Sequence, residues 1–190
     1  MLRFVVLCVL GALACAYASE LRVLHPTFLK RVDQRYMQHG KITAGLGNFG
    51  HFNYGTTIKG RLHYPLANQD GCREFKDEDF NQEHLKEGQE QKHQPFIMVD
   101  RGNCHFTKKS LNIQKYGGVL AIIVDSKAGE DPEHLMMADD SQGSSISIPT
   151  FNIALETGTV LKDAIHQTEA ENQEEGKNDE KAKKNNLVIL

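Results

Sequence analysis

Arg101 stands where α/β proteins commonly place a ligand-binding residue, directly after an apolar strand and at the turn into a helix. Its guanidinium carries five N–H donors in a planar fork, which suits peptide carbonyl groups or a carboxylate. In the same turn, Gly102 can adopt backbone angles that other residues avoid, and Asp100 can accept backbone N–H groups. The alternative is a structural role, in which Arg101 pairs with Asp100 or caps a neighbouring loop.

Catalytic and metal chemistry have no comparable support in the sequence. Ser110 and Ser126 lack the G-x-S-x-G setting of an activated serine. The nine histidines include no H-E-x-x-H motif and no pair one helical turn apart, so no metal and no cofactor are expected. Scattered histidines would at most make ligand release depend on pH. The sequence therefore predicts a protein that is not an enzyme.

The elements that must position Arg101 form a strand–helix–strand unit. Phe96–Val99 and Val119–Val124 are continuous apolar runs, which is typical of parallel strands buried on both faces. Between them, Cys104–Tyr116 has helical periodicity and is followed by two glycines. Such a unit is expected to be right-handed and parallel. Further strands are predicted at 21–24, 56–64, 148–153 and within 186–190, and a second helix at 157–168.

The amino-terminal residues predict entry into the secretory pathway. Met1–Ala18 has a basic start, an apolar run and small residues before the expected cleavage point, as signal peptides do. An uncleaved membrane anchor is the alternative, but the apolar run is shorter than the roughly 20 residues that a span needs. With 25 acidic and 22 basic residues and no tryptophan, nucleic acid is not an expected partner. The predicted location is the secretory lumen, a vacuole or endosome, or the extracellular space.

Only Cys72 and Cys104 lie beyond the predicted signal peptide. An even pair in an oxidising compartment favours a single disulfide. Such a bridge would close a long loop and add roughly 3–4 kcal/mol of stability if it is unstrained. Two free thiols or a redox pair are the alternatives, although no C-x-x-C motif is present.

Six short motifs in a fixed order carry a resemblance to a known family. Together they resemble a protease-associated (PA) domain and, within that family, the amino-terminal PA domain of plant-type vacuolar sorting receptors. The resemblance covers nearly all of residues 19–190. The motifs are AGLGNFG (44–50), YP (64–65), GC (71–72), VDRGNCHF (99–106), QKYGG (114–118) and IP (148–149).

The resemblance implies a fold, a disulfide and a site. The expected fold is α/β (α+β): a partly open, seven-stranded β-barrel or sandwich flanked by two main helices. Residues 19–190 would form a single domain with a Cys72–Cys104 bridge. The charged composition of 169–184 separately predicts a flexible insertion, which is extra to the family pattern. Oligomeric state is not indicated. The implied ligand-binding residues are Arg101, Gly102, Met137, Ala138 and Asp139.

Two functions follow from the resemblance. The first is non-catalytic binding of peptide segments from soluble secretory or vacuolar proteins, and the second is docking to a protease as an accessory protein. Met137 could provide a ligand wall or anchor its loop to the core, and Asp139 could attract a basic ligand or be a plain surface charge. Thr43 stands where the receptors have a cysteine. A stand-alone secreted protein and a truncated receptor product both fit these features.

Overall fold

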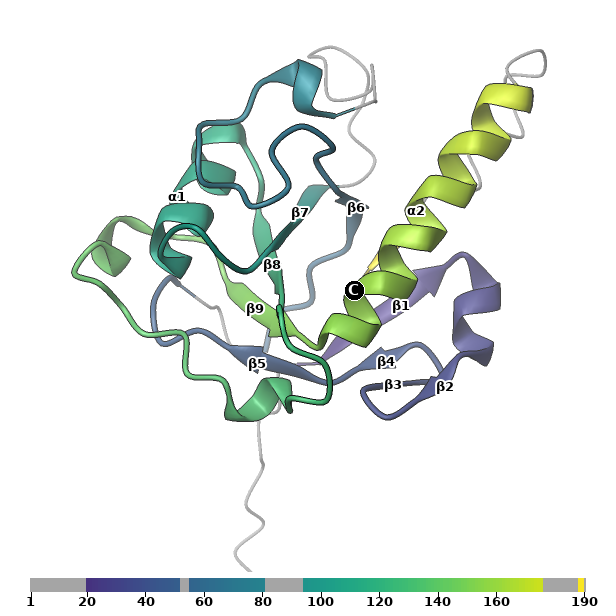
Figure 1. Cartoon of the computed structure of the whole chain (residues 1–190), viewed down its shortest axis with the longest axis horizontal. Coiled ribbons are helices and arrows are strands. Elements are labelled where there is room, and N and C mark those ends of the chain that lie inside the picture. Colours follow the sequence, from purple (N-terminus) through teal and green to yellow (C-terminus); the bar gives the residue numbers. More distant parts are fainter. Residues whose placement is uncertain (1–19, 52–54, 81–93, 176–187, 190) are drawn as a thin grey trace, which may run out of the picture.

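The computed structural model describes residues 20–51, 55–80, 94–175 and 188–189, so the predicted signal peptide at 1–18 lies outside it. The described residues form a mixed α/β fold (Figure 1). Short 3-10 helices lie at Thr27–Arg31, Asp77–Asp79, Pro132–His134 and Gly143–Ser145. The α-helices are α1 (Phe106–Tyr116) and α2 (Leu155–Glu175), and the strands are β1 (Leu21–His25), β2 (Asp33–Gln34), β3 (Met37–Gln38), β4 (Lys41–Ile42), β5 (Ala44–Leu46), β6 (Gly60–His63), β7 (Gln94–Asp100), β8 (Leu120–Val124), β9 (Thr150–Ile153) and β10 (Val188–Ile189).

The strands pair in the order β2-β3-β4-β1-β10-β6-β7-β8-β9-β5. Strands β6 to β9 are parallel, and the remaining pairs are antiparallel. The order does not close on itself, so the architecture is open, with a small β2–β3–β4 ladder continuing through β1 into the larger sheet. The mixed α/β fold with two helices is confirmed. The described residues hold ten strands where seven were expected, because strands of two residues leave no alternating pattern in a sequence.

The parallel strands separate two hydrophobic clusters. Alternate side chains of a strand point to opposite faces, so Met98 and Ile122 belong to the cluster that contains α2 residues. Ile97 and Ile123 instead pack in the cluster that contains Ile113 of α1. Figure 1 shows the two helices on opposite sides of β7 and β8. The sheet is thus buried on both faces, as the continuous apolar runs predict.

A glycine has a structural role in each helix: one ends α1, and another lets α2 pack closely on the sheet. Gly117 terminates α1 with a φ of 100°, and the N–H of Gly118 donates to the Ile113 carbonyl at 2.9 Å. In α2, a Cβ added at Gly158 would lie 2.2 Å from Cγ1 of Val124. The absence of a side chain at this position therefore allows α2 to approach β8 closely.

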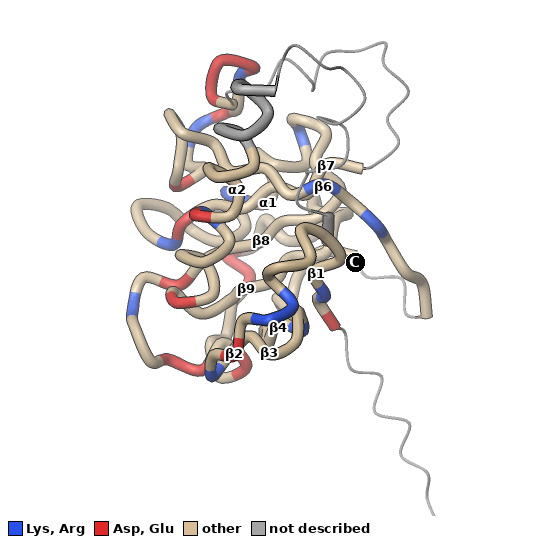
Figure 2. Tube along the Cα trace, turned by 90° about the vertical axis from the view of Figure 1, so that its right-hand side faces the viewer, with Lys and Arg blue, Asp and Glu red and all other residues tan. Residues whose placement is uncertain are grey.

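The second helix is longer than predicted. It runs to Glu175, so residues 169–175 of the expected flexible insertion are helical, and residues 176–184 lie outside the described part of the chain. The reason is that glutamate, glutamine and alanine have high helix propensity and extend a helix whose first turns are already packed. No helix in the described residues is long and apolar enough to cross a membrane. Basic and acidic residues are interspersed along the trace (Figure 2).

Candidate functional site

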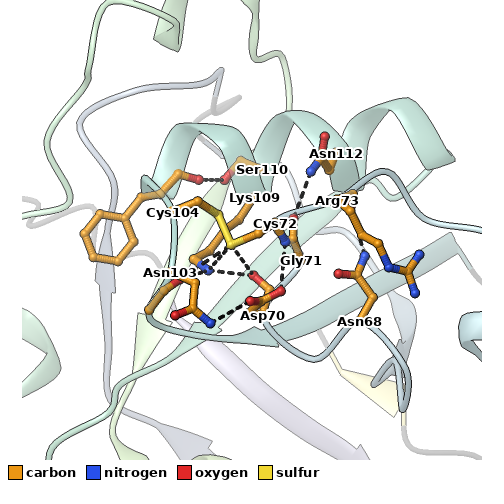
Figure 3. Close-up of a disulfide and its surroundings, with 12 residues drawn as sticks. Asn68, Asp70, Gly71, Cys72, Arg73, Asn103, Cys104, Lys109, Ser110 and Asn112 are labelled. Carbon is orange, nitrogen blue, oxygen red and sulfur yellow. Dashed lines mark hydrogen bonds between the residues drawn. A yellow bond between two sulfur atoms is a disulfide. The ribbon is translucent and has the colours of Figure 1, made fainter.

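An open hollow of about 670 Å³, called the groove below, lies at the carboxyl end of β7. Its two walls are formed by residues from the loop 66–73 and from the turn 100–103. The loop follows the strand end because the N–H of Asp100 donates to the Gln69 carbonyl at 2.7 Å. The walls are also joined covalently, since Cys72 and Cys104 form a disulfide (Figure 3). The predicted bridge is therefore present in the structure.

Arg101 lies at the edge of the groove and is already partly engaged. Its Nη1 donates to Oδ1 of Asp125 at 2.9 Å, and its guanidinium carbon lies 5.7 Å from the centre of the Phe106 ring. The ion pairs are with Asp125 and, at 3.8 Å, with Glu130, not with Asp100 as the structural alternative supposed. In the described part of the chain, Nε and Nη2 make no hydrogen bond, and the side chain is 29% exposed. Arg101 therefore combines a structural contact with free donors.

Asp100 organises the strand end through side chains rather than through backbone N–H groups. Its two oxygens accept hydrogen bonds from Tyr64 Oη at 2.7 Å and from Lys162 Nζ at 2.6 Å. Burial and the neighbouring Asp100 carboxylate raise the pKa of Tyr64 well above its ordinary value. The prediction that Asp100 holds the turn through N–H bonds was wrong, because Tyr64, which directly follows β6, and Lys162 of α2 are distant from Asp100 in sequence. Asp100 thus connects α2 to the groove.

The turn itself depends on two residues with positive φ. Gly102 has a φ of 125° and is exposed, which confirms the backbone role predicted for this glycine. Asn103 has a φ of 61°, and its Nδ2 donates to Oδ2 of Asp70 at 2.8 Å. Asp70 also accepts the N–H of Cys72. A hydrogen-bonded bridge therefore parallels the disulfide between the two walls.

Lys109 is a site residue that sequence reasoning missed. Its side chain is fully buried in α1, and its Nζ donates to the carbonyls of Asp70 and Gly102, each at 2.6 Å (Figure 3). Burial lowers the pKa of Lys109, while Asp70 and Asp100 oppose that shift. The ammonium thus joins both walls from beneath. Its burial could have been inferred from its position four residues before Ile113, on the apolar stripe of the helix.

The second predicted segment does not line the groove. Met137 is 1% exposed and packs in the cluster that contains Phe49, which favours the alternative that it anchors its loop to the core. Its neighbour Met136 is 78% exposed. Ala138 and Asp139 are exposed, and Asp139 accepts the N–H of Gly143 at 2.7 Å. The same loop is attached to the first turn of α1, where Asp140 accepts a hydrogen bond from the Thr107 hydroxyl. Ligand contact by 137–139 stays a prediction. Within the described residues, no three His, Cys, Asp or Glu side chains are grouped as a metal site requires.

The groove loop, residues 66–73, and the 3-10 helix Asp77–Asp79 that follows it should lose stability in acid. Hydrogen bonds from Asn103 and from the Cys72 N–H lower the pKa of Asp70. Burial raises the pKa of Asp79, but hydrogen bonds from Arg73 and from the Lys76 N–H outweigh this effect and lower it overall. A carboxyl group whose pKa is lowered on folding stabilises the fold above its ordinary pKa, and this contribution is lost as the pH falls through the folded-state value.

We therefore expect the free energy of unfolding to fall as the pH is lowered from about 4, near the ordinary aspartate pKa. Urea unfolding measured from about pH 6 to pH 2 tests this expectation. Asp79→Asn should show a shallower decline, because one of the responsible groups no longer titrates. A free energy of unfolding that stays constant from about pH 6 to pH 2 would contradict the stabilising role given to Asp70 and Asp79.

A family match and similar sequences both agree with the resemblance described in the sequence analysis. The PA domain family matches residues 58–161. Vacuolar-sorting receptor 2 of Arabidopsis thaliana is 31% identical over 77% of this chain and 22% of the receptor, and vacuolar-sorting receptor 1 of Pisum sativum is 33% identical over 66% of this chain and 20% of the receptor. The chain thus spans about a fifth of the length of these relatives. A zinc aminopeptidase from Bacillus subtilis has a similar fold, with a TM-score of 0.51 and 13% identity over 90% of this chain and 28% of the enzyme.

Proposed function

Because the chain belongs to the PA domain family, we propose that it is a non-catalytic protein of the secretory pathway that binds peptide segments of soluble proteins. Similarity to two vacuolar-sorting receptors supports the secretory pathway as its location. The disulfide is consistent with an oxidising compartment. The proposed peptide site is the groove.

The observation that carries this proposal is that Arg101 is held in place by one nitrogen while its other donors make no hydrogen bond in the described residues. An arginine held by Asp125 through one nitrogen keeps a fixed orientation, so little side-chain entropy is lost when a ligand binds. Arg101 lines the open hollow and its Nε and Nη2 make no hydrogen bond within the described residues, so peptide carbonyls or a carboxylate could accept from these donors. Asn103 and Asp70, on opposite walls, add polar groups suited to a peptide backbone.

Affinity capture from a secretory-compartment extract tests the proposal. The purified protein is the bait, and bound proteins are identified by mass spectrometry. We expect several soluble proteins to bind the wild type and to be lost with Arg101→Ala. Arg101→Lys should also bind weakly, although a lysine can keep the ion pair with Asp125, because it lacks the planar fork. Arg22→Ala, which removes a 56% exposed arginine of β1, should bind as the wild type does.

Other outcomes would redirect the assignment. A single protease retained equally by the wild type and both Arg101 variants would favour the accessory-protein function. Capture of no soluble protein by the folded wild type would contradict peptide binding at the groove.

A further inference from the structure

The disulfide has an asymmetric electrostatic environment. Nζ of Lys109 lies 3.4 Å from Sγ of Cys72, and no polar contact to Sγ of Cys104 is found in the described residues. The ammonium has three N–H donors, and its three acceptors are this sulfur and the two carbonyls of Asp70 and Gly102. Three acceptors match the charged ammonium, since a neutral amine would turn its lone pair toward one of them.

Lys109 is buried without a carboxylate partner. Its side chain is 0% exposed, and in the described part of the chain no carboxylate lies within ion-pair distance of its Nζ, although Asp70 and Asp100 act on it from farther away. A buried charge is costly unless an opposite charge compensates it. A thiolate on Cys72 would provide that charge at the position where the sulfur already lies. The ammonium should therefore stabilise Cys72 as a leaving thiolate, and a leaving thiol with a lower pKa departs faster in disulfide exchange.

We propose that the Cys72–Cys104 bond is a thiol-exchange site, in which an external thiolate attacks Sγ of Cys104 and Cys72 leaves as a thiolate held by Lys109. The new S–S bond joins the external sulfur to Cys104, and the electron pair of the broken bond goes to Cys72. Both cysteines are partly exposed, so a monothiol such as glutathione can reach the bond. Because the bond joins the two groove walls, exchange would also loosen the groove, a consequence that rests on the proposed function.

Mapping of the mixed disulfide tests the exchange chemistry without any peptide ligand. The oxidised wild-type protein is treated briefly with reduced glutathione at neutral pH, quenched with acid, alkylated and digested. We expect mass spectrometry to find glutathione on Cys104 and the alkyl group on Cys72. Glutathione found mainly on Cys72, or equally on both cysteines, would overturn the proposal. This measurement needs no variant and therefore does not depend on the folding of a mutant.

Two lysine variants then test the role of the ammonium. Lys109→Met should react with glutathione at least about threefold more slowly than the wild type, because the leaving thiolate loses its counter-charge. Lys108→Met removes the neighbouring, partly exposed lysine of α1 and should leave the rate unchanged. A folded Lys109→Met protein, verified by circular dichroism, that exchanges as fast as the wild type would contradict the role of Lys109. If Lys109→Met does not fold, the wild-type map alone decides.

Discussion

Replacing both bridge cysteines, as in Cys72→Ala/Cys104→Ala, should lower the free energy of unfolding by roughly 3–4 kcal/mol. The bond joins residues 32 positions apart and so removes much of the conformational freedom of the unfolded chain. In the folded protein it holds the groove loop against the start of α1, where the Asp70–Asn103 hydrogen bond remains as a weaker link. Urea unfolding of the variant and the wild type measures this difference.

The reduced wild-type protein, kept in excess dithiol, is the matched control for the cysteine variant. It should be destabilised by a similar amount, since it also lacks the crosslink. A loss below about 1 kcal/mol in both proteins would show that the loop is already restricted in the unfolded chain, contrary to the loop-entropy account.

Asp125→Ala should lower the free energy of unfolding by about 2–4 kcal/mol, the range for breaking a buried, hydrogen-bonded charge pair. The Asp125 side chain is 1% exposed. Its Oδ1 accepts a hydrogen bond from Nη1 of Arg101 at 2.9 Å. The same oxygen accepts the backbone N–H groups of Ser126 at 2.6 Å and of Lys127 at 3.3 Å. Removing the carboxylate leaves the Arg101 guanidinium with only the longer ion pair to Glu130, whose Oε2 lies 3.8 Å from Nη1. Asp125→Asn retains an acceptor oxygen and should cost less.

A double-mutant cycle with Arg101→Ala measures the ion pair itself. Because each single variant breaks the same contact, we expect the double variant to be less destabilised than the sum of the two single effects. Urea unfolding of the four proteins gives the coupling energy. Purely additive effects would contradict the view that Asp125 holds Arg101 in place.

The sequence predicts the strand–helix–strand unit well because its signals are local. Continuous apolar runs define β7 and β8, and Gly117 ends the helix between them as expected. The position of Arg101 at the groove follows from this unit. Its partner could not be predicted, because Asp125 lies next to Arg101 only through the parallel register that pairs Asp100 with Val124. That register is a tertiary property of the sheet.

Other features were missed for different physical reasons. A lysine on an apolar helical stripe is usually at the surface, so the burial of Lys109 contradicts the general tendency of its residue type. The helical continuation of α2 through 169–175 was obscured by its high charge, which resembles that of a flexible segment. The burial of Met137 beside an exposed Met136 depends on how a long loop packs against the core.

Site-directed photocrosslinking tests the central claim, peptide binding at the groove, most directly. A photoreactive residue replaces Gln69, whose exposed side chain lines the groove, and in a matched protein it replaces Gln38, which is exposed on β3 toward the far end of the sheet. Both proteins are irradiated in secretory-compartment extract. We predict crosslinks to soluble secretory proteins from position 69 and not from position 38, and their loss when Arg101→Ala is added. Equal crosslinking from both positions, or none from position 69, would contradict the assignment.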